Sequence, residues 1–197
     1  MTAYWNHNSA YHDWISAVAM QHRGTVLDVG CGEGLLIQRL SSISASVTGI
    51  DPDNAAVARA RSRVSGLPNV TVEEAGFFEY VAKERSYDLV TFVASLHHLN
   101  LPAALQRARS LLRPGGEIIV VGLSANKAAA DWVVSGLQLP LVRLGSWMHH
   151  ETRDIGVVTT AARHSLREIR MVVQNELPGS RIRRGLYYRY LLRWKKT

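Results

Sequence analysis

The sequence predicts an α/β fold built on a doubly wound parallel sheet, and two patterns carry that prediction. Between residue 25 and about residue 124, short apolar runs rich in β-branched residues alternate with segments of helical periodicity. This alternation is typical of parallel βαβ units. The run LVTFVAS at residues 89–95 is almost continuously apolar, as expected for a strand that helices cover on both faces.

Five runs are expected to form strands, and the segments between them to form helices. The strands are expected at residues 25–30, 46–51, 69–74, 87–95 and 117–122. The helix at residues 53–64 starts at Asp53, a residue type that caps the first turn of helices. The helix at residues 100–116 starts at Asn100, followed by Pro102, and ends with the stop signal RPGG.

The pattern changes after residue 124. Residues 127–145 are apolar and are expected to be helical with a break at Pro140. Residues 146–162 are expected to form a loop, and residues 164–175 another helix. From residue 181 to residue 196, aromatic and aliphatic residues alternate with basic ones, which predicts a terminal hairpin with a basic face.

Composition excludes several classes of protein. The one cysteine, Cys31, excludes an internal disulfide, and we interpret it as a small residue in a tight turn and not as a nucleophile. No apolar run approaches the roughly 20 residues of a membrane span, so no membrane partner is expected. The first residues show neither a basic start nor an apolar signal core, so a cytoplasmic location is expected.

The positive charge is concentrated at the C-terminus. The formal net charge is +7, and residues 181–197 hold seven basic residues and no acid, whereas the rest of the chain has 16 of each. Basic side chains on an edge strand prevent association between sheet edges. We therefore interpret this stripe as a solvated face, which argues against nucleic acid as the partner.

A glycine-rich turn follows the first expected strand. Asp28 is followed by Gly30, Gly32 and Gly34 in the pattern D-x-G-x-G-x-G. Glycines between a parallel strand and a helix let backbone N–H groups approach a ligand, and a nucleotide-like ligand fits there. The dinucleotide fingerprint fails because its third glycine position is Leu35, and no Gly-Lys-Ser/Thr follows, as a phosphate-binding loop requires.

A second feature suits a nucleoside. Asp51 ends the second expected strand, 21 residues after Gly30, and a carboxylate at that place can accept hydrogen bonds from two ribose hydroxyls. Together with VLDVGCGEG, the segments GIDPD, YDLV and LLRPGGEIIV resemble the class I S-adenosylmethionine-dependent methyltransferase family over roughly residues 20–125.

The resemblance implies a Rossmann-like doubly wound sheet of seven strands, mostly parallel with the last strand antiparallel. It implies a single methyltransferase domain over residues 1–197, with an N-terminal cap segment at 1–22 and an acceptor lid region at 125–165. S-adenosyl-L-methionine is then the cofactor. Asp28 and the glycine loop would border its methionine part, Asp51 would bind the ribose, and Pro52 would lie by the adenine.

The segment after the third strand departs from the family pattern. Where the family often has an acid that accepts from the adenine amino group, this chain has Gly76 and Phe77. Backbone contacts, packing of Phe77, or the carboxylate of Glu79 can substitute, and the sequence leaves all three open. The residues expected to bind the cofactor are Asp28, Gly30, Cys31, Gly32, Gly34, Asp51, Pro52, Gly76, Phe77, Tyr11 and His12.

Two histidines at the end of the fourth strand are the candidate catalytic residues. Methyl transfer from a sulfonium is an in-line displacement, so alignment of the acceptor supplies much of the rate. A base is needed only if the acceptor must lose a proton, and His97 or His98 could take it. The alternative is that one of them packs under the following helix and caps its backbone.

Two further segments could enclose an acceptor. The aromatic N-terminus could fold over the cleft through Tyr4, Tyr11 and His12; alternatively, Trp5 and Trp14 simply pack on the sheet. WMHHE at residues 147–151 could act as a lid or form a solvated loop. No metal site is expected, because His97 and His98, like His149 and His150, are adjacent residues without a ligand-type spacing.

The sequence thus predicts an enzyme that uses S-adenosylmethionine to methylate a small-molecule acceptor. The first alternative, an RNA methyltransferase, lacks an Asn-Pro-Pro-Tyr type motif after the fourth strand and an appended RNA-binding domain. The second alternative is a non-catalytic module that binds the same cofactor. The acceptor, the attacked atom (O, N, S or C) and the oligomeric state stay open.

Overall fold

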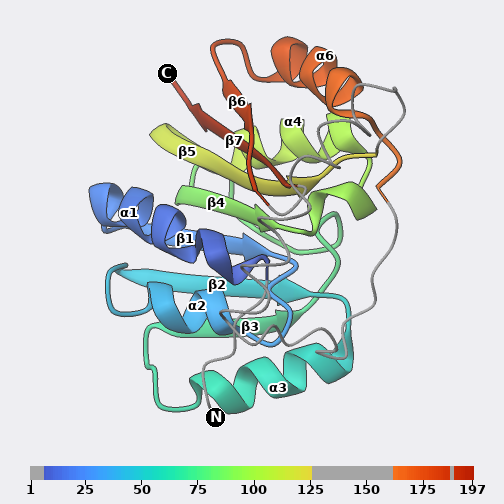
Figure 1. Cartoon of the computed structure of the whole chain (residues 1–197). Helices are drawn as coiled ribbons and strands as arrows, with labels where there is room; N and C mark the ends of the chain where they lie inside the picture. The colour runs from blue at the N-terminus through green and yellow to red at the C-terminus, as the bar shows by residue number, and fades with distance from the viewer. Residues whose placement is uncertain (1–6, 126–161, 187–188) are drawn as a thin grey trace.

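A computed structural model describes residues 7–125, 162–186 and 189–197, and these residues form one seven-stranded sheet. The strand order is β3-β2-β1-β4-β5-β7-β6 (Figure 1). Neighbouring strands from β1 to β5 pair in parallel, and β7 pairs antiparallel with both β5 and β6. The expected sheet is confirmed. Its strands are β1 Thr25–Val29, β2 Ser46–Asp51, β3 Val70–Glu74, β4 Tyr87–Val93, β5 Leu112–Leu123, β6 Arg181–Arg184 and β7 Arg189–Lys195.

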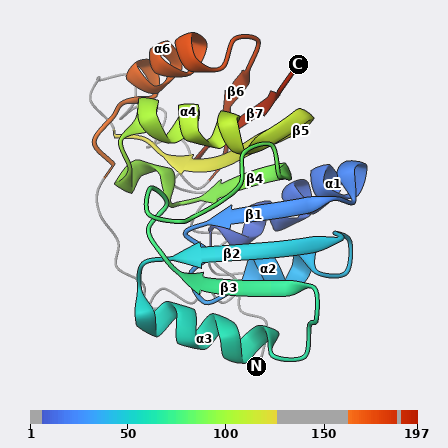
Figure 2. The ribbon, with the colours of Figure 1, turned by 180° about the vertical axis from the view of Figure 1, so that it is seen from behind.

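Helices cover both faces of the sheet. One face carries α1 (His12–His22), α2 (Leu35–Leu40) and α3 (Asn54–Val64), and the other carries α4 (Leu101–Leu111) and α6 (Leu166–Glu176). Figure 1 shows α1 and α2 in front of the sheet, and Figure 2 shows α4 in front when the molecule is seen from behind. Each face has its own apolar core, as a doubly wound sheet requires.

Three of these helices begin at polar capping residues, two of which, Asp53 and Asn100, were expected from the sequence. The side chain of Asp53 accepts from the backbone N–H groups of Ala55 and Ala56 at the start of α3. Asn100 accepts from the N–H of Ala103 at the start of α4. Ser165 and Glu168 form a reciprocal capping box at the start of α6. These caps satisfy N–H groups that the first helical turn leaves without a partner.

Two expected boundaries are wrong near the fifth strand. The helix that was expected to reach residue 116 ends at Leu111, and β5 starts at Leu112, so RPGG lies within the strand. The reason is long-range: Leu112 pairs with Tyr87 of β4, and the N–H of Gly115 donates to the carbonyl of Lys196 near the C-terminus. The fourth strand ends at Val93, two residues early, because Ala94 adopts a φ of +53°.

The C-terminal hairpin is confirmed, but its basic face is only partly solvated. Tyr190, Leu192 and Trp194 are buried on the face that α4 and α6 cover. Arg193 forms two hydrogen bonds with the buried carboxylate of Glu117 in β5. Arg189 donates to Asn8.

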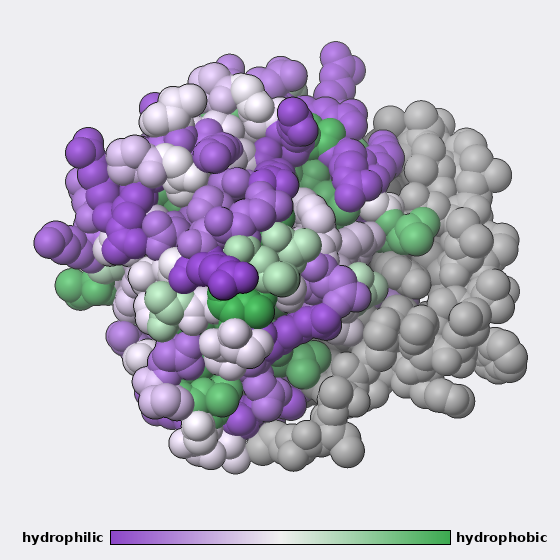
Figure 3. All heavy atoms as spheres, turned by 90° about the vertical axis from the view of Figure 1, so that its left-hand side faces the viewer, coloured by the Kyte–Doolittle hydropathy of each residue, from purple (hydrophilic) through white to green (hydrophobic). Residues whose placement is uncertain are grey.

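Figure 3 faces the end of the molecule at which β1 to β5 begin, and shows a mostly hydrophilic surface with small, separate hydrophobic patches. No helix in the described part of the chain is both long and apolar enough to cross a membrane. The expectations for residues 127–145 and 147–151, and those for Tyr4 and Trp5, lie outside the described residues.

Candidate functional site

The turn after β1 is shaped by three glycines with positive φ. Gly30, Gly32 and Gly34 have φ values of +73°, +55° and +83°, a region in which other L-residues are strained. The N–H groups of Gly30 and Cys31 both donate to the carbonyl of Ile50, at 2.8 and 3.0 Å. These bonds fix the turn against the end of β2.

The three glycines differ in what surrounds them. A Cβ on Gly30 would overlap the side chain of Ser95, and a Cβ on Gly34 would lie 3.1 Å from the Cβ of Ala60. A Cβ on Gly32 would meet no atom within 4 Å. Gly30 and Gly34 therefore serve close packing, whereas Gly32 borders open space at the carboxyl edge of the sheet. Bare backbone beside open space is what a bound cofactor would need here.

Asp51 is held in a fixed orientation next to this space. It ends β2 and is 8% exposed. Its Oδ2 accepts from the N–H of Gly32 and its Oδ1 from the N–H of Asp53, each at 2.9 Å. Each carboxylate oxygen can accept a further hydrogen bond. The carboxylate can therefore accept hydrogen bonds from two neighbouring hydroxyl groups.

Asp28 lies beneath the glycine turn and is almost fully buried, at 2% exposure. Thr91 of β4 donates a hydrogen bond of 2.6 Å to its Oδ1. Burial raises the pKa of Asp28 to about 7; the bond from Thr91 lowers it, and the charge of Asp51 raises it further. A cationic group close to Asp28 would favour its charged form. Thr91 was missed by sequence reasoning, because only the pairing of β1 with β4 brings it opposite Asp28.

Cys31 lies in the same turn as a buried thiol. Burial raises its pKa, as do the charges of Asp28 and Asp51. The Cβ and Sγ of Cys31 lie where a side chain on Gly49 would have to be. Cys31 therefore packs closely against β2, and the raised pKa of its thiol disfavours the thiolate form that a nucleophile needs.

The two candidate catalytic histidines lie together after β4. The hydroxyl of Ser95 donates to the carbonyl of Val29, and the short helix η2 (Leu96–His98) follows. The rings of His97 and His98 have their centroids 4.1 Å apart. His97 is half-buried and His98 is exposed. The side chain that caps the first turn of the following helix is that of Asn100.

Phe77 occupies the core and not the edge of the sheet. It is 3% exposed, and its ring packs edge-to-face on Phe92 with centroids 5.4 Å apart. The guanidinium of Arg107 lies over the same ring. The expectation that the Phe77 ring packs on adenine is therefore corrected. Backbone contacts near Gly76 and the carboxylate of Glu79 are the candidates that are left.

The N-terminal residues contact the C-terminal hairpin. The hydroxyl of Tyr11 donates to the carbonyl of Leu186 at 2.7 Å. His12 is 6% exposed, and burial, assisted by the charge of Arg39, lowers its pKa to about 4. Trp14 packs against the core beneath α1. The hydrogen bond of Tyr11 thus ties the N-terminal segment to the C-terminal hairpin.

No metal centre is formed by the residues that the structure describes, since nowhere among them do three or more His, Cys, Asp or Glu side chains converge. His149 and His150 lie outside those residues.

Comparison with known proteins identifies relatives over nearly the whole chain. Residues 26–116 match a family model described as a methyltransferase domain. An uncharacterized methyltransferase of Mycobacterium bovis is 31% identical over 198 residues, which cover 97% of this chain and 96% of the relative. A ubiquinone biosynthesis O-methyltransferase of Paraburkholderia xenovorans is 36% identical over 146 residues, or 72% of this chain and 62% of that protein.

Solved structures agree with the fold. A SAM-dependent methyltransferase from Aquifex aeolicus superposes with a TM-score of 0.61 at 18% identity, covering 95% of this chain and 92% of that one. The region matched by the family model contains the glycine turn, Asp51 and the two histidines after β4.

Proposed function

Because this chain belongs to the class I S-adenosylmethionine-dependent methyltransferases, with S-adenosylmethionine as its cofactor, we propose that it methylates a small-molecule acceptor. The observation that carries the cofactor site is the hydrogen bond between the N–H of Gly32 and Asp51, at the border of open space. The acceptor would lie at the carboxyl ends of β4 and β5, beside His97 and His98, where open α/β sheets bind their ligands.

Each part of the cofactor has matching residues. The glycine turn and Asp28 would border the methionine part, where the buried carboxylate would attract the ammonium group. Asp51 would receive the two ribose hydroxyls on the oxygens that Gly32 and Asp53 hold in place. Pro52 and the backbone at Gly76 would lie by the adenine, because Ala75 donates to the carbonyl of Asp51 and brings these segments together.

The chain contributes mainly orientation to the reaction. S-adenosylmethionine, when bound, supplies a methyl group on a sulfonium that leaves readily. The protein has to hold the acceptor atom in line with that methyl and keep competing water out. If the acceptor carries an O–H or N–H proton, a nitrogen of His97 or His98 would take it. The two rings lie only 4.1 Å apart, and one acceptor proton needs one base, so a single histidine is expected to act.

Two observations support a small acceptor. The relative from Paraburkholderia xenovorans is named a ubiquinone biosynthesis O-methyltransferase. Several basic residues of the hairpin bond inward, to Glu117, to Asn8 and to the backbone carbonyls of Arg109 and Leu112. A surface that tracked a nucleic-acid backbone would instead have to present such charges outward.

The test is the transfer of a labelled methyl group. The protein would be incubated with labelled S-adenosylmethionine and a fractionated metabolite extract, and the labelled product identified by mass. The Asp51→Ala variant should bind S-adenosylhomocysteine at least tenfold more weakly, since it loses hydrogen bonds to a charged acceptor. Labelled RNA in place of a labelled metabolite would refute the acceptor class, and unchanged binding by Asp51→Ala would refute the site.

A further inference from the structure

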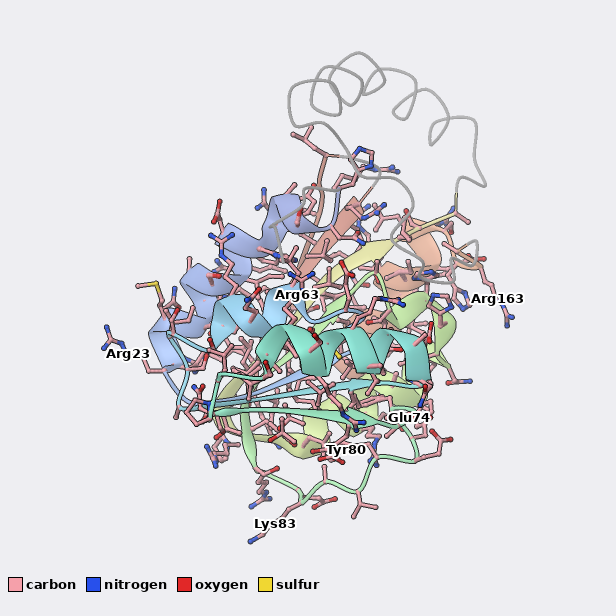
Figure 4. The ribbon with its side chains drawn as sticks, turned by 90° about the horizontal axis from the view of Figure 1, so that it is seen from below. Arg23, Arg63, Glu74, Tyr80, Lys83 and Arg163 are labelled. Carbon is pink, nitrogen blue, oxygen red and sulfur yellow. The ribbon has the colours of Figure 1, made fainter. Side chains whose placement is uncertain are left out.

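The glycine turn is held from α3 by the side chain of Arg63. Its Nε donates a hydrogen bond of 2.9 Å to the carbonyl of Glu33, the residue between Gly32 and Gly34. Its Nη2 lies 3.6 Å from Oε1 of the same residue. Figure 4 shows Arg63 where α3 lies next to α2, the helix that starts directly after the turn. One guanidinium thus contacts both the backbone and the side chain of Glu33.

The second half of the turn depends on α3. The N–H groups of the first half donate to residues at the end of β2, whereas the second half lies against α3. There, a Cβ on Gly34 would be only 3.1 Å from the Cβ of Ala60. In the described part of the chain, the bond from Arg63 is the one side-chain hydrogen bond to the backbone of Glu33 or Gly34. Arg63 therefore fixes the part of the turn that β2 does not.

Arg63 is buried in spite of its charge. Its side chain is 4% exposed, and taking a guanidinium out of water is costly unless charged and hydrogen-bonding partners replace the water. Glu33 supplies such partners through its carbonyl and its carboxylate. Arg59, one helical turn earlier, places its Nε 3.7 Å from Oε2 of Glu33. Lysine at position 63 would reproduce only part of this contact, because it lacks the planar fork that reaches two acceptors in fixed directions.

A change in this turn would reach the cofactor site through Gly32. Gly32 borders the open space at the carboxyl edge, and its N–H donates to Oδ2 of Asp51. Glycines can adopt conformations that other residues cannot, so a turn that is not held from α3 would sample more than one of them. When only a fraction of the molecules has the conformation that a ligand needs, the affinity is reduced by that fraction.

We propose that Arg63 is a positioning residue for the cofactor: acting through Glu33, it keeps the glycine turn in the conformation that receives S-adenosylmethionine. This inference rests on the cofactor site described under the proposed function. If the turn without Arg63 has the binding conformation about a tenth of the time, the dissociation constant rises about tenfold. In the bound state the turn is already ordered, so kcat is retained while KM for S-adenosylmethionine rises.

The first experiment measures the dissociation constant of S-adenosylhomocysteine by calorimetry. Arg63→Met removes the donors and keeps an apolar stem, and should weaken binding about tenfold or more. Arg63→Lys keeps the charge but can bond to only one of the two acceptors, so its affinity should lie between those of wild type and Arg63→Met. Arg61→Met is the matched control and should leave the constant unchanged. Arg61 belongs to the same helix, but its Nε donates to the carbonyl of Val72 in β3, away from the turn.

The second experiment reports on the turn without any cofactor. Hydrogen exchange of the free protein, followed by mass spectrometry, should be faster in peptides that contain residues 30–34 for Arg63→Met than for wild type or Arg61→Met. Saturating S-adenosylhomocysteine should remove this difference. A purely structural role of Arg63 would instead lower the melting temperature and speed exchange throughout the chain. In the labelled-methyl assay, the Arg63 variants should show a raised KM for S-adenosylmethionine at a retained kcat.

The outcomes distinguish this inference from the proposed function. Wild-type affinity in Arg63→Met, or equal losses in Arg63→Met and Arg61→Met, would overturn the role of Arg63 even while Asp51→Ala still weakens binding. If wild-type protein does not bind S-adenosylhomocysteine, the cofactor site is wrong and this role falls with it. If Arg63→Met does not fold, Arg63→Lys against Arg61→Lys gives the same comparison. A selective loss of affinity together with faster exchange confined to the turn supports the proposal.

Discussion

Asp28 and Thr91 face each other across β1 and β4, and the Thr91 hydroxyl donates a hydrogen bond of 2.6 Å to the Asp28 carboxylate. Both side chains are buried, at 2% and 0% exposure. Burial is the main cause that raises the pKa of Asp28 to about 7. A carboxyl group that titrates near neutral pH directly under the glycine turn links proton binding to the cofactor site.

The raised pKa of Asp28 predicts how stability depends on pH. Between about pH 4 and pH 7 the folded chain holds a proton on Asp28 that the unfolded chain has lost. Stability therefore falls as pH rises through this window, because the unfolded state binds fewer protons. Urea unfolding of wild type and Asp28→Asn across the window should show this slope in wild type and a smaller one in the variant. Asp13→Asn, at an exposed position, is the control, and equal slopes in all three proteins would contradict the prediction.

Replacing the histidines after β4 is expected to change turnover without changing cofactor affinity. If one of them is the base, its replacement by alanine should lower turnover about a hundredfold or more with little change in cofactor affinity. The other histidine should tolerate replacement, since one acceptor proton needs only one base. Turnover and calorimetry on His97→Ala and His98→Ala would test this. Near-normal turnover in both variants would mean that the chain acts by positioning alone.

Much of this fold is encoded locally, and the parts that were missed are not. Asp53 and Asn100 are helix caps because their side chains reach N–H groups two or three residues on, a distance that a sequence pattern can express. The start of β5 at Leu112 depends on pairing with Tyr87 of β4, and Gly115 bonds to Lys196, far away in the chain. Only strand pairing brings Thr91 to Asp28, 63 residues earlier.

The same division applies to the candidate site. The glycine turn and Asp51 could be predicted, because their residue types and spacing indicate the conformation that the backbone must adopt. The position of Phe77 could not, because an aromatic residue after a strand is equally compatible with the core and with the edge. Packing on Phe92 and the guanidinium of Arg107, which comes from α4, decides it.

The C-terminal hairpin predicts weak binding to nucleic acids. Arg181, Arg183 and Arg184 are exposed on the edge strand β6, and about three phosphate contacts would give a log-log salt slope of only ~2 to 3. Fluorescence anisotropy should show RNA and DNA binding that disappears at physiological salt, whereas methyl transfer should be nearly independent of salt. Tight binding to a structured RNA, lost when these three residues are changed to Gln, would overturn the small-molecule assignment.

Because Arg193 pairs with Glu117, we expect the arginines of this hairpin to contribute unequally to stability. Glu117 is 2% exposed and belongs to β5, and Arg193 of β7 donates to both of its oxygens. Burial raises the pKa of Glu117, but hydrogen bonding to Arg193 holds it below its usual value. His22, whose Nε2 lies 3.3 Å from Oε1 of Glu117, lowers it further. The pair joins the central sheet to the hairpin on the side where α1 packs.

Removing Arg193 would leave a buried carboxylate with a weaker set of partners. Arg193→Gln should lower the free energy of unfolding by about 3 kcal/mol, the low end for breaking a buried ion pair, because the Arg193 side chain is itself 35% exposed. Arg181→Gln, an exposed change on the same hairpin, should cost less than about 0.5 kcal/mol.

Since the pKa of Glu117 is lowered in the folded state, the stability that the pair contributes is present above the unfolded pKa and is lost as pH falls through the folded one. Denaturant unfolding of the two variants at neutral and acidic pH measures both effects. Equal losses of stability at neutral pH would show that the pair does not stabilise the fold.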